Sequence, residues 1–445
     1  MDTRYDQIFK AYDVRGTTPD QFDAGMARAI GAAFAKFAGA ERVLVARDMR
    51  PSGIDLAAAF TEGALGQGVD VIDLGLASTD LLYFASGHLD APGAVLTASH
   101  NPAQYNGIKM CLAGAKPIGG DTGLDVIKAD AMAGLAEAGS TGQRSEMDLL
   151  DAFADHVVSF IDVSAIRPLK VVADTANGMG GLVAPAVLDR LPIEYEIMYA
   201  ELDGTFPNHP ADPINVENLA DLRARVLEVG ADLGLAFDGD ADRVFLVDDR
   251  AEPISGSITT ALVAKGILGR NPGATILHNL ICSKSVPEVV REGGGTPVRT
   301  KVGHSYIKAV MAEEGAVFGG EHSGHYYFAD NWRADSGLIA ACVVMEQLSA
   351  AGVAMSELRT PVERYVASGE INSKVDDTTA VIEAVAARYG DAEQDRLDGL
   401  TVDFGDWWFN LRPSNTEPLL RLNLEAADAE ACRARTDEVL ALIRG

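Results

Sequence analysis

Three segments of the chain repeat one order of strand-like and helix-like patterns. Each segment begins with a β-rich run that ends in polar turn residues, at positions 42–48, 170–174 and 275–279. A helical pattern, a second strand and a second helix follow, and a Gly-Ala pair then opens a third strand, at positions 93–96, 230–233 and 315–318. Strands that alternate with helices predict βαβ units with a largely parallel sheet. Repetition on this scale predicts three related α/β domains.

The last part of the chain has a different pattern. Beyond residue 361, a helical stretch precedes three strand-like runs, and a final helix extends to residue 445. This order predicts a smaller α+β domain. A chain of 445 residues is too long for a single hydrophobic core. We therefore expect three α/β domains with mostly parallel mixed sheets and a fourth α+β domain around a central cleft, at residues 1–145, 146–250, 251–365 and 366–445.

A polar motif follows the third strand of each repeat. The motifs are TASHNP at 97–102, DGDADR at 238–243 and GEHSGH at 320–325. Because α/β folds bind ligands at the carboxyl ends of parallel strands, we expect each domain to offer one loop to a shared cleft. The alternative is three unrelated loops on separate faces of the protein.

The first motif offers a candidate nucleophile, Ser99, followed by His100. A serine hydroxyl is a weak nucleophile and needs a base or a metal ion to react. The G-x-S-x-G motif of lipases is absent, which argues against acyl transfer. Taken alone, the motif is also compatible with an ordinary serine in a turn.

The second motif carries three alternating carboxylates, Asp238, Asp240 and Asp242, followed by Arg243. Such carboxylates can face one point, and hard oxygen ligands suit Mg²⁺. An EF-hand is a poor match because its sixth position should be glycine and a helix, not a strand, should precede the loop. The haloacid-dehalogenase loop also fits poorly, and the remaining alternative is a solvated acidic turn. Arg243 could orient one carboxylate or contact a phosphate.

Two further loops carry groups that suit a sugar phosphate. In the first, Glu321, Ser323 and His325 combine a carboxylate and a hydroxyl that suit sugar hydroxyl groups, although a structural turn is an equal alternative.

The second, the RPSNTEP loop at 412–418, resembles a phosphate clamp, because arginine offers a planar fork for phosphate oxygens and small polar side chains add donors. The clamp residues are Arg412, Ser414, Asn415 and Thr416. The alternative for this loop is a hairpin with a surface arginine.

Four other residues are candidates for proton transfer or charge. Lys109 and His304 are candidate proton-transfer groups, since histidine can act near neutral pH. Tyr12 and Arg15 lie in YDVRG, where the arginine could add a cation to the cleft. Each of the four is also compatible with a surface, capping or turn position.

The composition excludes several classes of function. The formal net charge is −28, and no basic run marks a nucleic-acid or anionic-membrane binder. No stretch approaches the ~18 apolar residues of a membrane span, and no signal peptide is visible. The four cysteines form no CxxC pair, so we expect a cytoplasmic protein without a zinc or redox motif. An anionic small substrate stays compatible with the charge, because a pocket can gather a few cations.

Together, the ordered motifs closely resemble the α-D-phosphohexomutase superfamily, and within it the phosphomannomutase/phosphoglucomutase branch. The resemblance extends from FKAYDVRG at 9–16 to RPSNTEP at 412–418. It implies four domains around a deep cleft, three of them related α/β units. By this resemblance Ser99 looks like the serine that carries phosphate in the resting enzyme, and the three aspartates match Mg²⁺ ligands, with a phosphoserine oxygen as a further ligand.

The same resemblance implies roles for the other candidates. Glu321 and Ser323 match the residues that bind the sugar hydroxyl groups, and residues 412 and 414–416 match a distal phosphate site. Lys109 and His304 match positions implicated in acid–base catalysis.

The implied reaction interconverts hexose 1- and 6-phosphates through a hexose 1,6-bisphosphate, which also serves as activator. His322 and Asn415 favour mannose or glucose, because phosphoglucosamine mutases resemble GEQSG and RPSG at these loops. The alternatives are a phosphoglucosamine mutase, a metal-dependent sugar phosphatase and a non-catalytic sugar-phosphate binder. We expect hexose phosphates as the partners, with no nucleic acid or membrane, and a monomer or dimer.

Overall fold

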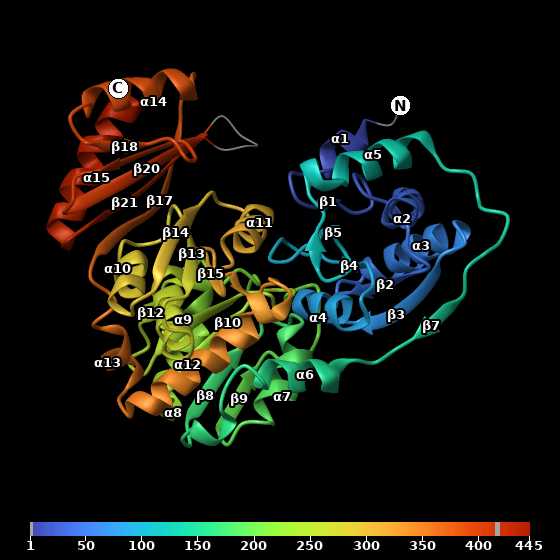
Figure 1. Cartoon of the computed structure of the whole chain (residues 1–445), viewed down its shortest axis with the longest axis horizontal. Helices are drawn as coiled ribbons and strands as arrows, with labels where there is room; N and C mark the ends of the chain where they lie inside the picture. The colour runs from blue at the N-terminus through green and yellow to red at the C-terminus, as the bar shows by residue number, and fades with distance from the viewer. Residues whose placement is uncertain (1–2, 414–418) are drawn as a thin grey trace. The chain divides into compact units, whose positions relative to one another are not determined.

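The structure is a computed structural model that describes residues 3–413 and 419–445, apart from the side chains of Asp121, His304 and Ser305. The described chain divides into two units, and Figure 1 labels the helices and strands that belong to them. The first unit contains Met1–Ser255 and Ser323–Leu358, and the second contains Gly256–His322 and Arg359–Gly445. No helix among the described residues has both the length and the apolar character needed to cross a membrane.

The first sheet of the first unit has a parallel centre and an antiparallel edge. Its strand order is β1-β5-β4-β2-β3-β7, and β6 (Lys116–Pro117) pairs with β5. The strands are β1 (Val14–Thr17), β2 (Arg42–Arg47), β3 (Asp70–Leu76), β4 (Gly93–Leu96), β5 (Tyr105–Leu112) and β7 (Arg144–Glu146). β4, β2, β3 and β7 are parallel to one another, whereas β5 is antiparallel to β4 and β1 to β5. All four residues of β4 are buried, so both faces of the sheet are covered at its centre.

Helices with apolar faces cover this sheet. They are α1 (Arg4–Ile8), α2 (Ala24–Ala38), α3 (Gly53–Gly66), α4 (Thr79–Leu89) and α5 (Leu124–Ala133). Buried residues of α2, α3, α5 and the strands form one hydrophobic core. Glycine allows α2 and α3 to pack closely, because a Cβ at Gly31 would lie 2.1 Å from the carbonyl oxygen of Phe60.

The second sheet of the first unit has the strand order β12-β11-β10-β8-β9. Its strands are β8 (Lys170–Asp174), β9 (Glu194–Met198), β10 (Leu233–Phe237), β11 (Val244–Asp248) and β12 (Pro253–Ile254). β10, β8 and β9 are parallel, and β11 is antiparallel to β10. The remaining elements of this unit are α6 (Leu150–Val158), α7 (Gly180–Leu188), α8 (Ala220–Val229), β16 (Tyr326–Phe328), α12 (Gly337–Ala351) and α13 (Met355–Arg359).

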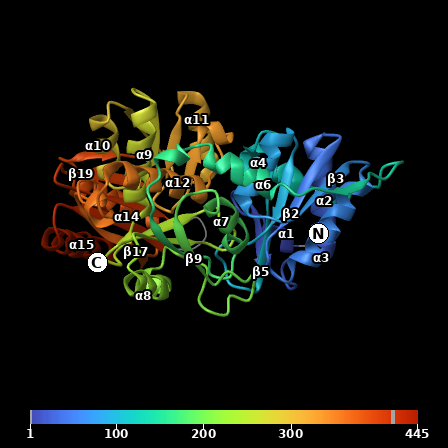
Figure 2. The same ribbon diagram turned by 90° about the horizontal axis from the view of Figure 1, so that it is seen from below.

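The second unit contains a third parallel arrangement, in the order β14-β13-β15. Its elements are α9 (Gly256–Arg270), β13 (Thr275–Asn279), α10 (Ser285–Glu292), β14 (Thr296–Thr300), α11 (His304–Glu314) and β15 (Phe318–Gly320). Helices α9 and α10 lie side by side in both ribbon views (Figures 1 and 2). In all three sheets the strand that comes first in the repeat lies between the second and the third. The predicted repeat is therefore confirmed.

An antiparallel sheet completes the second unit, in the order β17-β21-β20-β19-β18. Its strands are β17 (Val366–Lys374), β18 (Glu393–Asp395), β19 (Leu400–Asp403), β20 (Trp407–Pro413) and β21 (Leu419–Ala426), with α14 (Thr378–Arg388) and α15 (Ala429–Arg444). Apolar residues of the strands and of both helices share one core. The predicted fold class, three related α/β domains and a smaller α+β domain, is confirmed. The sequence did not predict β17, an edge strand with mostly exposed residues.

Candidate active site

The predicted nucleophile lies in the loop that follows β4. Ser99 is 5% exposed, and its backbone has φ 50°. This left-handed conformation is uncommon for a residue with a Cβ and marks local strain. The Ser99 amide donates a hydrogen bond to Thr97 Oγ1 at 3.0 Å. The Ser99 hydroxyl in turn donates to Asp238 Oδ2 at 2.8 Å, so the first two polar motifs meet at one point.

The acidic loop follows β10, whose five residues are all buried. Asp238, Asp240 and Asp242 are 0%, 0% and 1% exposed. Each of them offers a carboxylate oxygen that lies within 4.8 Å of the others. These three residues are called the aspartate cluster below. The alternative of a solvated acidic turn is excluded because all three side chains are buried, and buried carboxylates need cations or hydrogen-bond donors.

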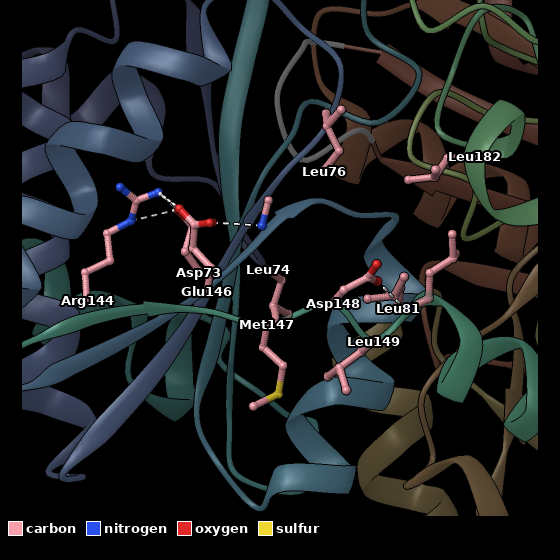
Figure 3. Close-up of a pocket in the computed structure, with 12 residues that line it drawn as sticks. Asp73, Leu74, Leu76, Leu81, Arg144, Glu146, Met147, Asp148, Leu149 and Leu182 are labelled. Carbon is pink, nitrogen blue, oxygen red and sulfur yellow. Dashed lines mark hydrogen bonds and ion pairs between the residues drawn. The ribbon is translucent and has the colours of Figure 1, made fainter.

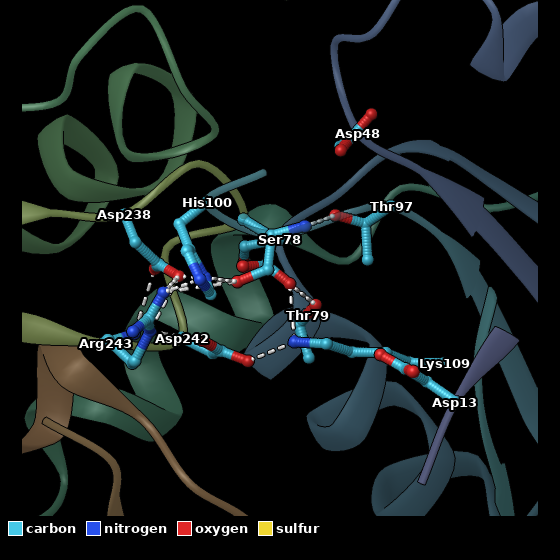
Figure 4. Close-up of polar contacts among 12 residues, drawn as sticks. Asp13, Asp48, Ser78, Thr79, Thr97, His100, Lys109, Asp238, Asp242 and Arg243 are labelled. Atoms are coloured by element: carbon cyan, nitrogen blue, oxygen red, sulfur yellow. Dashed lines mark hydrogen bonds and ion pairs between the residues drawn. The ribbon is translucent and has the colours of Figure 1, made fainter. Parts of the chain in front are cut away.

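Lys109 supplies a cation to two members of the aspartate cluster. It lies on β5, and its Nζ is 2.6 Å from Asp240 Oδ2 and 2.6 Å from Asp242 Oδ2 (Figure 4). The hydroxyl of Thr79, at the start of α4, donates to Asp240 Oδ2 at 2.6 Å. Burial lowers the pKa of Lys109, but the two carboxylates outweigh it and hold that pKa well above its usual value. Lys109 therefore stays protonated in this arrangement.

The aspartate cluster fits a hard divalent cation. Oδ1 of Asp240 and Oδ1 of Asp242 are buried, and no described residue donates a hydrogen bond to either oxygen. When all three are ionised, the carboxylates outnumber the two cationic side chains beside them, Lys109 and Arg243. Carboxylate oxygens are preferred ligands of Mg²⁺, which usually also retains water or substrate oxygens. An ammonium group between two of the carboxylates shows that the cluster accepts positive charge.

Arg243 and His100 complete the surroundings of Asp238. The Arg243 backbone amide and Nε donate to Asp238 at 3.2 Å and 2.9 Å, and Nη2 donates to His100 Nδ1 at 2.6 Å (Figure 4). Burial and the charge of Arg243 lower the pKa of His100 to about 2. His100 is therefore neutral near pH 7, and its Nδ1 lone pair already accepts a hydrogen bond from arginine.

The carboxylates of the cluster differ strongly in proton affinity. Burial raises the pKa of Asp238 to about 8, with repulsion from Asp240 and Asp242 adding to the effect and Arg243 opposing it. Burial also raises the pKa of Asp240, but Lys109 and Thr79 outweigh it and lower that pKa below the usual range. Such divergence among neighbouring carboxyl groups is common at functional sites.

Arg15 and His325 also lie at this site. Arg15, on β1, donates from Nη1 to Asn101 Oδ1 at 2.7 Å, next to the serine loop. His325 Nε2 lies 4.0 Å from Asp242 Oδ1, and its Nδ1 is 3.0 Å from Ser323 Oγ. Tyr12 is partly buried just before β1.

The other predicted site residues lie in the second unit. Glu321 follows β15, is 2% exposed, and accepts at Oε1 from Asn279 Nδ2 at 3.2 Å and from the Gly303 amide at 3.1 Å. Arg412 lies on β20, with Nη1 3.7 Å from Asp398 Oδ2. The side chain of His304 and residues Ser414, Asn415 and Thr416 lie outside the described residues.

Sequence reasoning missed two residues of this site. Thr79 binds Asp240, and the only sequence signal for it is a Ser-Thr-Asp helix start after β3. Arg50 is completely buried beneath the serine loop and is held by Asp48. Its sequence context, RDMR after a strand, resembles an ordinary charged loop, so burial was not predictable from it.

A separate hollow of about 520 Å³ lies elsewhere in the first unit (Figure 3). Leucine and methionine side chains line most of it, and Arg144 pairs with Asp73 at its edge at 2.6 Å. None of the predicted site residues lines this hollow, so it is distinct from the serine and aspartate loops.

Four sequence families match successive parts of the chain. They are described as phosphoglucomutase/phosphomannomutase alpha/beta/alpha domains I, II and III and the C-terminal domain, at residues 6–134, 151–252, 255–365 and 370–442. These matches cover most of the chain in the expected order.

Relatives of similar length match over nearly the whole chain. A protein of Xanthomonas campestris named "Phosphohexose mutases" is 41% identical over 444 residues, covering 98% of this chain and 99% of its own. A phosphomannomutase of Salmonella montevideo is 40% identical over 453 residues, covering 98% of each chain. The crystal structure of a phosphoglucomutase/phosphomannomutase family protein from Burkholderia thailandensis is 34% identical, with a TM-score of 0.91 over 100% of this chain and 98% of that one. The chain therefore belongs to the α-D-phosphohexomutase superfamily and is an isomerase that transfers phosphoryl groups.

Proposed function

We propose that this phosphohexomutase interconverts mannose 6-phosphate and mannose 1-phosphate, with glucose phosphates as a second substrate pair. The proposed route uses a phosphoserine at Ser99 and a hexose 1,6-bisphosphate, which also serves as activator. The observation that carries the proposal is the 2.8 Å hydrogen bond from the Ser99 hydroxyl to Asp238 within the aspartate cluster. It joins a nucleophile to a cation site, as phosphoryl transfer requires.

We assign the aspartate cluster and an oxygen of phospho-Ser99 as ligands of Mg²⁺. When bound, the ion would neutralise negative charge on the transferring phosphoryl group. The cluster suits this role because it is buried, because its three carboxylates outnumber the two cations beside them, and because two of its carboxylate oxygens accept no hydrogen bond from the described residues.

The reaction consists of two transfers. In the first, a free hydroxyl of the hexose monophosphate attacks the phosphorus of phospho-Ser99. A bond from phosphorus to the sugar oxygen forms, the bond to Ser99 Oγ breaks, and the sugar proton moves to a base while Oγ gains one. The bisphosphate then reverses its orientation, and Ser99 Oγ takes the other phosphoryl group by the same exchange.

The surrounding side chains have distinct assignments. Asp238 accepts the hydrogen bond of Ser99, and Arg243 orients Asp238 through Nε. His100, whose Nδ1 accepts from Arg243 at 2.6 Å, helps to fix that guanidinium. Lys109, which stays protonated between two carboxylates, supplies positive charge to the cluster, and its candidacy for proton transfer rests on its sequence motif alone. His304 remains the second candidate for proton transfer, from its sequence motif.

Substrate binding is assigned from the sequence motifs. We assign sugar and phosphate contacts to Tyr12, Arg15, Glu321, Ser323, His325, Arg412, Ser414, Asn415 and Thr416. The Salmonella relative is named a phosphomannomutase, and its 40% identity over nearly the whole chain supports mannose. The domain limits given from the sequence and the choice between monomer and dimer stay predictions.

One experiment tests the function and its substrate. Turnover of mannose, glucose and glucosamine 1-phosphates, each primed with its 1,6-bisphosphate, would be measured alongside release of inorganic phosphate. We expect isomerised mannose and glucose phosphates, slow turnover of glucosamine phosphate and little free phosphate. Release of phosphate in proportion to substrate consumed would instead identify a phosphatase, and a preference for glucosamine would refute the mannose assignment.

A further inference from the structure

The guanidinium of Arg50 forms hydrogen bonds with four backbone carbonyls of the serine loop. Arg50 follows β2 and is 0% exposed. Nη2 donates to Ser99 O at 2.8 Å and to Asn101 O at 2.6 Å, and Nη1 donates to Pro102 O at 2.8 Å and to Tyr105 O at 3.0 Å. One side chain thus contacts most of the turn from residue 99 to residue 105.

The remaining contacts of Arg50 hold the guanidinium itself in place. Its Nε donates to Asp48 Oδ2 at 3.1 Å, and the Arg50 amide donates to Asp48 Oδ1 at 2.9 Å. Asp48 is also 0% exposed, so the two charges balance in the interior. The guanidinium carbon lies 5.0 Å from the centre of the Phe206 ring, a cation–π contact. All five N–H groups of the side chain are therefore used.

The contact with Ser99 bears directly on the nucleophile. A carbonyl held by a buried arginine cannot turn without leaving charged donors unpaired, which is costly in the interior. The Ser99 backbone has φ 50°, and such a strained conformation persists only where surrounding contacts hold it. Lysine offers three donors from a single point and cannot span four carbonyls in a plane.

We propose that Arg50 is a positioning residue that keeps the Ser99 hydroxyl directed at Asp238 during phosphoryl transfer. Arg50 does not touch the Ser99 hydroxyl and acts through the backbone of the loop. This inference rests on the proposed phosphoserine role of Ser99. A misplacement of about 1 Å at a reacting group can cost on the order of 100-fold in rate.

The test is Arg50→Lys in the full-length protein. Transfer from mannose 1,6-bisphosphate to the enzyme would be followed by intact mass in a single turnover, per folded molecule. We expect transfer at least about tenfold slower, a matching fall in kcat and a KM for sugar phosphate within about twofold of wild type. Amide hydrogen exchange at residues 99–106 should be faster in the free variant, and this readout does not depend on catalysis.

Arg190→Lys is the matched control. Arg190 also donates to backbone carbonyls in the first unit, at Ala186 O and Asp151 O, but away from the serine loop. We expect this variant to transfer at the wild-type rate, whatever its stability. Equal slowing in both lysine variants would mean that Arg50 has only a structural role and would overturn the proposal.

A second variant applies if Arg50→Lys does not fold. Phe206→Leu keeps Arg50 but removes the ring beneath it, and we expect roughly two- to fivefold slower transfer, with Phe206→Tyr at the wild-type rate. A phosphoryl-transfer rate in Arg50→Lys equal to that of the wild type would overturn the proposal. If Arg50→Lys does not fold, a wild-type rate in Phe206→Leu would overturn it. Absence of transfer in the wild-type protein would instead refute the proposed function.

Discussion

The Ser99 hydroxyl donates a hydrogen bond to Asp238 Oδ2 at 2.8 Å, although 139 positions separate the two residues in sequence. The same carboxylate oxygen accepts from Arg243 Nε at 2.9 Å. The loop after β4 and the loop after β10 thus meet through side chains that are both buried. A phosphoryl group on Ser99 would lie beside the aspartate cluster, so the proposed nucleophile and the proposed cation site are adjacent.

Ser99→Ala should abolish the phosphoenzyme. The substitution removes the only oxygen at this position that can carry phosphate, so we expect turnover to fall by about a thousandfold or more. Intact mass after incubation with bisphosphate, together with a coupled isomerisation assay, measures both effects. Ser140→Ala changes an exposed serine and should leave both unchanged. Full activity of Ser99→Ala would refute the assigned role.

Asp242→Asn should remove the stabilisation of the fold by Mg²⁺. In the wild type, the free energy of unfolding should rise by about 2.7 kcal/mol at a Mg²⁺ concentration one hundred times Kd. Burial and repulsion from Asp240 raise the pKa of Asp242, so a neutral amide should change the Mg²⁺-free stability by less than about 1 kcal/mol. Thermal unfolding with and without Mg²⁺ measures both quantities. Asp55→Asn, on the exposed face of α3, is the control, and an equal Mg²⁺ effect in both variants would contradict the cation site.

Lys109→Met should make stability more dependent on Mg²⁺. The ammonium lies 2.6 Å from carboxylates of Asp240 and Asp242, and its removal leaves the buried Asp240 anion without its cationic partner. We expect a loss of about 3 kcal/mol in Mg²⁺-free buffer, partly recovered when Mg²⁺ supplies the missing charge. Lys36→Met breaks an exposed pair with Asp130 and should cost less than about 1 kcal/mol. A Mg²⁺ shift in Lys109→Met no larger than in wild type would show that the ammonium and the ion do not share the cluster.

Much of the architecture was predictable because its signals are local. The strands at 170–174 and 275–279 match β8 and β13 to the residue, since β-branched runs bounded by turn residues mark a buried strand without tertiary information. The meeting of Ser99 with Asp238 was also predictable, because both residues follow the third strand of a parallel repeat.

Other contacts depend on tertiary structure that no local pattern encodes. The partners of Arg50 are backbone carbonyls, whose directions exist only once the serine loop is folded. Lys109 reaches the cluster because β5 is antiparallel to β4, with Lys109 opposite Val95. β17 was missed because its sequence, VASGEINSK, carries a glycine and few buried residues. Such a sequence is tolerated here because β17 lies at the edge of its sheet, beside β21.

His278→Gln should reduce the loss of stability in mild acid. His278 is 5% exposed on β13. Burial, with the charges of Arg299 and Arg291, lowers its pKa from 6.5 to about 4. Below pH 6.5 the unfolded chain binds a proton that the folded chain does not bind until about pH 4, so the free energy of unfolding falls as pH falls through this window.

The size of this effect is about 2 kcal/mol between pH 7.5 and pH 5. Denaturant unfolding at pH 7.5 and pH 5 gives the change in the free energy of unfolding for the wild type and for His278→Gln. The difference between the two changes cancels contributions from other titratable groups. The variant should lose less stability than wild type on acidification, while any offset between the two proteins should be constant above pH 7.5. If the free energy of unfolding fell equally with pH in both proteins, protonation of His278 would not destabilise the folded state, which would contradict the prediction.

Gly239→Ala should separate the serine loop from the aspartate loop. A Cβ at Gly239 would lie 2.4 Å from the carbonyl oxygen of Ser99, closer than side-chain carbons approach backbone atoms. We expect the strain to cost about 1–3 kcal/mol of stability and to slow phosphoryl transfer by at least about tenfold, because the Ser99 hydroxyl must move from Asp238. Gly139→Ala is the matched control, since a Cβ there meets nothing within 4 Å. Single-turnover transfer and thermal unfolding would be measured for both. A Gly239→Ala protein that is destabilised yet transfers at the wild-type rate would mean that contact between the two loops is not needed for the chemistry.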